Sequence, residues 1–274
     1  MKKNKWLYVC LGALCFSCTD YQHVSTPQYI TASAEKGMIH VTAGQNALQV
    51  GYNYRNGMNV FLNGFVRDNT SYVDEFKRYT LSNISIGTGF FLPDLANENT
   101  KLHAGIQFGV GAGNLNKDSL HFNSYTANGF IQPIIGMKYK KLFLGFSSLL
   151  EYKNYYETKI SDKYSTTNES LTYLLNNKNT EALFYEPCFF VQLGSGPVRF
   201  QAQYVKTFQL SNIPLVFPEN MIYLELNIHF NAFKDLREKE KQLTIKVPRE
   251  RKHRERRPHY RRKKVEVDQN LKTE

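Results

Sequence analysis

The chain of 274 residues has few cysteines, a single tryptophan and no long apolar run after its N-terminal leader. Cys10, Cys15 and Cys18 lie within the first 18 residues, which leaves Cys188 alone in the rest of the chain. A lone cysteine without ligand spacing argues against structural disulfides and against a zinc site. No later stretch approaches the roughly 18 consecutive apolar residues of a spanning helix, so a membrane location would require a closed sheet.

The chain does contain segments in which apolar and polar residues alternate, and its 18 Tyr and 19 Phe are typical of a composition that favours strands. In the last such segment Ile222, Leu224, Leu226, Ile228 and Phe230 share one parity, while polar residues occupy the other. A period of two predicts a strand with one apolar and one polar face. Ten strands are predicted, at 37–44, 47–55, 58–66, 78–91, 101–113, 122–139, 141–156, 181–194, 197–210 and 220–232.

The links between these segments alternate in length. Asn56-Gly57, 93–100, Lys140 with its neighbours and 194–197 are short, whereas 67–77, 114–121, 157–180 and 211–219 are longer. Transmembrane barrels combine short periplasmic turns with longer external loops. The predicted fold is therefore all-β, a single antiparallel transmembrane β-barrel of about ten strands over residues 37–233. Eight or twelve strands remain alternatives, because 37–55 could form one continuous strand.

The N-terminus has the layout of an export signal over residues 1–17, with Lys2, Lys3 and Lys5 before an apolar stretch that closes at Ser17-Cys18. Cys18 is the candidate for lipidation, although Cys15 and Phe16 depart from the usual lipoprotein pattern. Ordinary cleavage nearby is the alternative. Residues 18–36 contain Pro27 and no periodic pattern, which predicts a periplasmic tether.

Parity divides the strand residues into two sets. Leu102, Ala104, Ile106, Phe108 and Val110, followed by Leu142, Leu144, Phe146 and Leu150, are expected to face lipid. The opposite parity predicts a polar network in the lumen that serves as a structural plug rather than a transport path. Its members are Glu151, Glu186, Arg199, Gln201, Glu225 and His229, with Gln107, Lys153, Gln192 and Gln203 as further lumen candidates.

Six glycines of adjacent strands share one parity, and we interpret them as relief for barrel curvature. They are Gly87, Gly89, Gly105, Gly109, Gly111 and Gly113. The Gly109–Gly113 run is superficially similar to a nucleotide-binding loop but lacks the following helix.

Candidates for catalysis are few. His103 and His121 flank predicted strands five and six, with Asp118, Ser119 and Ser124 nearby, yet a polar external loop explains the same residues. His40 and His229 become neighbours if the first and last strands close the barrel. We predict no catalytic residue, no metal and no cofactor.

The C-terminal residues 234–274 hold 16 Lys or Arg against 8 Asp or Glu, a surplus of +8 within a net charge of +11. This tail is expected to be disordered or partly helical. The expected partner of the barrel is outer-membrane lipid. For the tail of an exported protein the expected partners are cell-wall carboxylates, acidic lipid headgroups or an acidic periplasmic protein rather than nucleic acid, and a solvated tail with no dedicated partner is the alternative. The basic residues are Arg249, Arg251, Lys252, Arg254, Arg256, Arg257, Arg261, Arg262, Lys263 and Lys264.

The leader, Pro27, the Ala34-Glu35-Lys36-Gly37 entry to the first strand and Leu48-Gln49-Val50-Gly51-Tyr52 together resemble small outer-membrane barrel lipoproteins of the Bacteroidota over residues 15–233. The resemblance implies an outer-membrane barrel and supplies no activity. The predicted function is a non-enzymatic structural or interaction role in the cell outer membrane. The alternatives are an outer-membrane hydrolase or acyltransferase, or a narrow channel.

Overall fold

The computed structural model describes residues 23–31, 35–69, 79–92, 95–97, 100–117, 121–160, 169–177, 179–194 and 196–231. They belong to a compact unit within Met1–Phe233, and the second unit, Lys234–Glu274, lies outside the described residues. The strands are β1 (Met38–Gly44), β2 (Ala47–Arg55), β3 (Met58–Asn69), β4 (Tyr79–Phe91), β5 (Leu95–Asn97), β6 (Thr100–Lys117), β7 (Phe122–Tyr139), β8 (Leu142–Lys159), β9 (Asn179–Leu193), β10 (Val198–Lys206), β11 (Phe208–Gln209) and β12 (Asn220–Asn231), with the helix α2 (Glu169–Asn176). In the described part of the chain no helix is long and apolar enough to cross a membrane.

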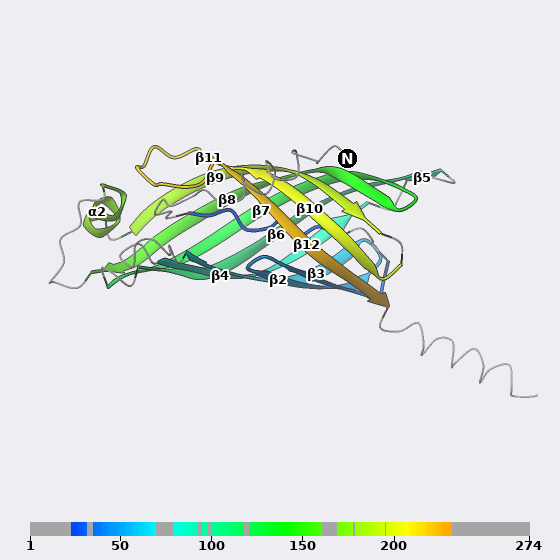
Figure 1. Ribbon diagram of the computed structural model, residues 1–274, viewed down its shortest axis with the longest axis horizontal. Coiled ribbons are helices and arrows are strands. Elements are labelled where there is room, and N and C mark those ends of the chain that lie inside the picture. Colours follow the sequence, from blue (N-terminus) through cyan, green and yellow to red (C-terminus); the bar gives the residue numbers. More distant parts are fainter. Residues whose placement is uncertain are drawn as a thin grey trace, which may run out of the picture. The chain divides into compact units, whose positions relative to one another are not determined.

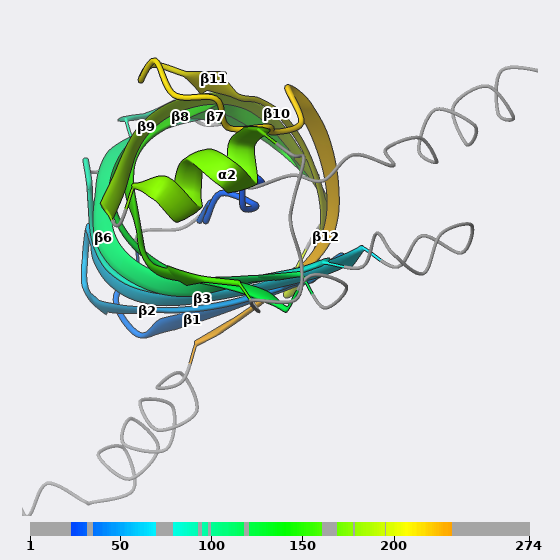
Figure 2. The same ribbon diagram turned by 90° about the vertical axis from the view of Figure 1, so that its left-hand side faces the viewer.

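Ten of these strands form a closed antiparallel barrel (Figure 2). Each pairs with its neighbour in the chain, and the circle closes where β12 pairs with both β10 and β1. The short strand β5 pairs with the start of β6, and β11 pairs with β9 just beyond the end of β10. The predicted ten-stranded barrel is confirmed, and the stretch 37–55 divides into two strands at the turn Gln45–Asn46.

The two ends of the barrel differ, and we name them by their connections. The turn end holds Asn56–Gly57, Lys140–Lys141, Gly196–Pro197, the start of β1 and the end of β12. The loop end holds α2 and residues 210–219. Figure 1 shows α2 at one extreme of the strands. Several strands run further than the alternation predicts, since β3 reaches Asn69, β6 reaches Lys117 and β8 reaches Lys159. The helix within 157–180 was not predicted.

The predicted sidedness of the wall is confirmed. On β6, Leu102, Ile106, Phe108 and Val110 are exposed on the outer face, and Gln107 between them is fully buried. The inner face at the loop end is apolar, and α2 lies across that mouth with Leu171 and Leu174 buried (Figure 2). The middle and the turn end of the bore are lined by polar side chains together with buried rings such as Phe91 and Phe143.

Inward glycines make room for aromatic rings. A Cβ at Gly109 would lie 2.6 Å from Cζ of Phe130, and one at Gly105 would lie 2.7 Å from Cε1 of Phe91. Rings of neighbouring strands therefore lie against bare backbone. The role in curvature stays a prediction, and the structure adds a packing reason that the glycine pattern did not reveal.

Candidate functional site

The N-terminal segment 23–31 runs through the bore of the barrel. At the loop end the His23 amide donates to the Val216 carbonyl at 3.5 Å, and at the turn end Thr31 lies against His40. Eight of its nine residues are buried. Figure 2 shows the segment in blue inside the ring of strands. These residues were expected to form part of a periplasmic tether; instead the barrel encloses them, and we call them the inner segment.

Wall glutamines hydrogen-bond the backbone of the inner segment, which has no strand partner of its own. The Gln28 amide donates to Gln203 Oε1 at 3.0 Å, and Gln203 Nε2 donates back to the Gln28 carbonyl at 2.9 Å. Gln49 donates to the Pro27 carbonyl at 2.7 Å, and Gln132 donates to the Tyr29 carbonyl at 3.3 Å. Because a buried peptide group without a partner costs about 1–3 kcal/mol, these four hydrogen bonds with three glutamines explain how the segment is held.

The inner segment also fits the wall sterically at Tyr29. Its ring stacks on Phe61 with centroids 4.7 Å apart, and it lies over Gly51 of β2. A Cβ at Gly51 would overlap the Tyr29 hydroxyl and lie 2.6 Å from Cζ. A cavity of about 20 Å³ remains beside this ring, which is room for about one water. The bore is filled at this level.

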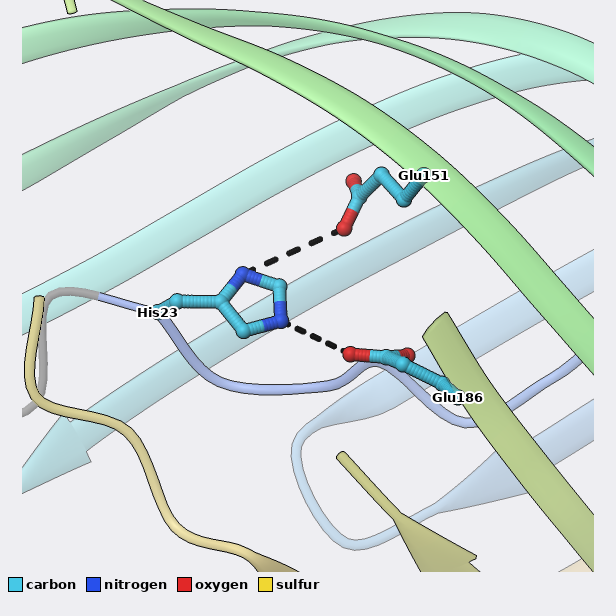
Figure 3. Close-up of side chains that lie close together, drawn as sticks. All are labelled: His23, Glu151 and Glu186. Atoms are coloured by element: carbon cyan, nitrogen blue, oxygen red, sulfur yellow. Dashed lines mark hydrogen bonds and ion pairs between the residues drawn. The ribbon is translucent and has the colours of Figure 1, made fainter. Parts of the chain in front are cut away.

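A buried cluster of charged and titratable side chains fixes His23 (Figure 3). Lys153 Nζ lies 3.1 Å from His23 Nδ1 and 3.5 Å from a Glu151 oxygen. An ammonium can only donate, so Nδ1 accepts and the ring carries its proton on Nε2. Nε2 then donates to Glu186 Oε1 at 2.7 Å. One ion pair and two hydrogen bonds thus connect the four side chains of Glu151, Lys153, His23 and Glu186 between β8, the inner segment and β9.

Three of these side chains, those of His23, Glu151 and Glu186, have ligand atoms within 4.8 Å of one another. Among the described residues they are the one group whose spacing would suit a metal ion. The arrangement does not favour a metal. Figure 3 shows the two carboxylates on opposite sides of the imidazole, each nearest a different ring nitrogen. A single ion cannot take both nitrogens, and the Lys153 ammonium already lies beside Nδ1. The geometry fits an ion network that fastens the segment.

The six lumen residues predicted from parity all face the bore, in three places. Glu151 and Glu186 meet at His23. Gln201 and Gln203 each donate to Glu225 Oε2, at 2.5 and 2.6 Å. Arg199 and His229 lie near the turn end, on β10 and β12. Sequence reasoning missed the partners supplied by the inner segment, because residues 23–31 show no periodicity that marks them as buried.

His40 and His229 are direct cross-strand partners in the β1–β12 pairing, as expected if the first and last strands close the barrel. Their Nδ1 atoms lie 2.5 Å apart. By contrast, the structure separates the residues considered for catalysis. His103 lies near the start of β6 and stacks on Phe91, whereas His121 follows its far end.

Lys117 lies fourteen positions after His103 on β6, about 45 Å of extended chain, so the two histidines cannot share one site. Ser124 is buried, and its hydroxyl lies 2.9 Å from that of Thr158. Asp118, Ser119, Cys18 and the basic tail lie outside the described residues.

Comparison with known proteins adds little. No protein-family model matches the chain, and no curated protein matches it. One solved structure, from work described as "Unveiling the Mechanism Behind the in-meso Crystallization of Membrane Proteins", is 15% identical, with 72% of this chain and 84% of that chain covered and a TM-score of 0.24. A similarity that low carries no argument. The class follows from the strand pairing: the protein is a closed antiparallel β-barrel whose bore holds a segment of its own chain.

Proposed function

We propose that the protein is an outer-membrane β-barrel with a closed bore and a non-enzymatic structural or interaction role. The observation that carries this proposal is the outer surface of the wall. Nine of the ten barrel strands expose large apolar side chains there, including Ile86 (60%), Val110 (62%) and Phe200 (70%). A soluble monomer rarely exposes a continuous apolar patch of more than a few hundred Å², whereas a lipid-facing barrel requires one on all sides.

Tyrosines at both ends of the outer surface support a membrane location. Tyr54 and Tyr139 are exposed near the turn end, and Tyr125, Tyr152 and Tyr204 are exposed near the loop end. Tyrosine favours the boundary between hydrocarbon and headgroups because its ring is apolar and its hydroxyl is polar. Two such groups bordering an apolar zone are typical of outer-membrane barrels.

The filled bore favours a closed barrel over the channel alternative. The inner segment occupies the centre, and α2 lies across the loop-end mouth. On this proposal the turn end faces the periplasm and the loop end faces the outside, where it is available for surface contacts. The bore then contributes stability and orientation rather than a path for solutes.

The first test is electrophoresis of the outer-membrane fraction with and without boiling, followed by planar-bilayer recording. A faster unboiled band and a silent bilayer are expected. Steady conductance that shifts when Glu186 or Arg199 is neutralised would replace the proposal with a channel. A soluble protein that migrates identically before and after boiling would refute the membrane location.

For the basic residues 249–264 we propose an anionic periplasmic partner such as the carboxylates of the cell wall. Ten of these sixteen residues are Lys or Arg, and a charge of that density binds anionic polymers in a salt-dependent way. Cosedimentation with purified cell-wall sacculi tests this. Removal of residues 234–274 should abolish binding at low salt, and equal sedimentation of the full and shortened chains would contradict it.

A further inference from the structure

Three basic residues lie near one another at the turn end of the bore, where β10, β12 and β1 are neighbouring strands. His40 of β1 and His229 of β12 are direct partners. Arg199 of β10 pairs with Asn227, two residues before His229 on the same face of β12. Arg199 acts electrostatically on both imidazoles. The guanidinium of Arg199 and the two imidazoles, from three adjacent strands, are therefore close together.

Nothing acidic balances this cluster among the groups that act on its imidazoles. Besides Arg199, His40 interacts with His103 and with the uncharged side-chain amide of Asn53, and His229 interacts with Lys138. The titratable groups among them are all basic. This differs from the centre of the bore, where the carboxylates of Glu151 and Glu225 have hydrogen-bond donors. The positive charge of Arg199, beside two imidazoles and with no carboxylate among the groups that act on them, favours an anion.

Two nitrogens of the cluster are buried without a hydrogen-bond partner. They are Nη1 of Arg199, which is always a donor, and Nε2 of His229. Thr31 Oγ1 lies 3.2 Å from His40 Nε2, and His40 Nδ1 lies 2.5 Å from His229 Nδ1. When the Thr31 hydroxyl donates to Nε2 of His40, the proton of His40 is on Nδ1 and is donated to Nδ1 of His229. The proton of His229 is then on Nε2. Both unpartnered atoms are then donors.

The cluster is accessible from one side. His40 and His229 are only 1% and 5% exposed, but Arg199 is half-buried. It is the second residue of β10, directly after the turn at Gly196–Pro197. A small ligand entering at the turn end would meet the guanidinium first and the His229 imidazole behind it.

We propose that this cluster binds a phosphate-type oxyanion between the Arg199 guanidinium and His229 Nε2. A guanidinium donates two parallel hydrogen bonds to a phosphate, and the imidazole supplies a third donor. The ligand would satisfy both buried nitrogens and neutralise the local charge. The phosphate could belong to free orthophosphate or to a phospholipid headgroup, which present the same group to the site.

The test is calorimetric titration of orthophosphate into the full chain folded in dodecyl maltoside, with R199M and H229F as test variants. R55M is the matched control, because Arg55 is an exposed arginine at the same end of the barrel. One phosphate per chain is expected for the wild type and R55M, with affinity reduced about tenfold to a hundredfold in R199M. R199K keeps the charge but loses the planar fork, and should bind with intermediate affinity.

Competition identifies the source of the phosphate. Dihexanoyl phosphatidic acid that displaces orthophosphate would show that a lipid headgroup enters the site, and failure to compete would restrict the site to free phosphate. The absence of saturable binding by the wild type, or equal binding by R199M, would overturn the proposal. Heat-modifiable migration of each variant shows that the barrel is intact, so a failure here is separate from a failure of the membrane proposal.

Discussion

Gln203 is the side chain whose loss should most clearly release the inner segment. In Q203L the amide and the carbonyl of Gln28 both lose their partner, and Glu225 loses one of its two donors. Each buried peptide group left unpaired costs about 1–3 kcal/mol, so the segment should be held less tightly by about 2–6 kcal/mol. Since 1.4 kcal/mol is a factor of ten, the released state should be populated at least about 25-fold more.

Limited proteolysis of the folded barrel in neutral detergent measures this release, because a released segment becomes open to cleavage within residues 23–31. Bilayer recording of the same samples should show openings that the wild type lacks. Y204F is the matched control, since Tyr204 is the next residue on β10, faces outward and bonds Asn220 at an exposed site. If Q203L stays as protected and as silent as Y204F while migrating as a folded barrel, then the hydrogen bonds to Gln28 do not hold the segment.

Three further substitutions test the wall and the bore. I86R places a charge on the outer surface midway along β4 and should cost about 2–4 kcal/mol of folding free energy in lipid vesicles; unchanged stability would argue against a lipid-facing position. K153M leaves Glu151 facing His23 without its ammonium and should destabilise the barrel by about 3–5 kcal/mol in urea titrations, with partial recovery in K153M/E151Q; equal loss in both variants would exclude this ion pair as the cause. G51A should push Tyr29 off the wall, lower the folding stability by about 1–3 kcal/mol and raise proteolysis of the inner segment. G51A/Y29A should recover the stability of the barrel but not the resistance of the inner segment to proteolysis.

The sequence predicts the wall of this barrel well and its contents poorly, for a physical reason. Each wall residue faces either the outer surface or the bore, so successive residues alternate between the two faces, and the partnership of His40 with His229 follows once the barrel closes. The inner segment contacts the wall on every side, so nothing alternates between His23 and Thr31. The lumen network was accordingly predicted as side chains that satisfy one another, whereas many of them hydrogen-bond the backbone of a segment that looked like a tether.

The long strands show a second limit. Alternation weakens where β6 and β8 pass beyond the apolar zone, because both faces there include polar residues, and pairing continues without the pattern. α2 was hidden for a related reason. Its eight residues supply barely two turns, too few for a helical period to stand out within the predicted loop 157–180.

The inner segment bears on the order in which the molecule can assemble. The chain passes from the loop end to the turn end inside the bore, and a few residues later it becomes β1, the first strand of the wall around it. Threading a finished ring would drag eight buried residues past the wall without their hydrogen bonds. Enclosure while β1 and β12 are still apart avoids that barrier. The pairing of β1 with β12, where His40 meets His229, is then the last part of the wall to form, and the barrel closes around the inner segment.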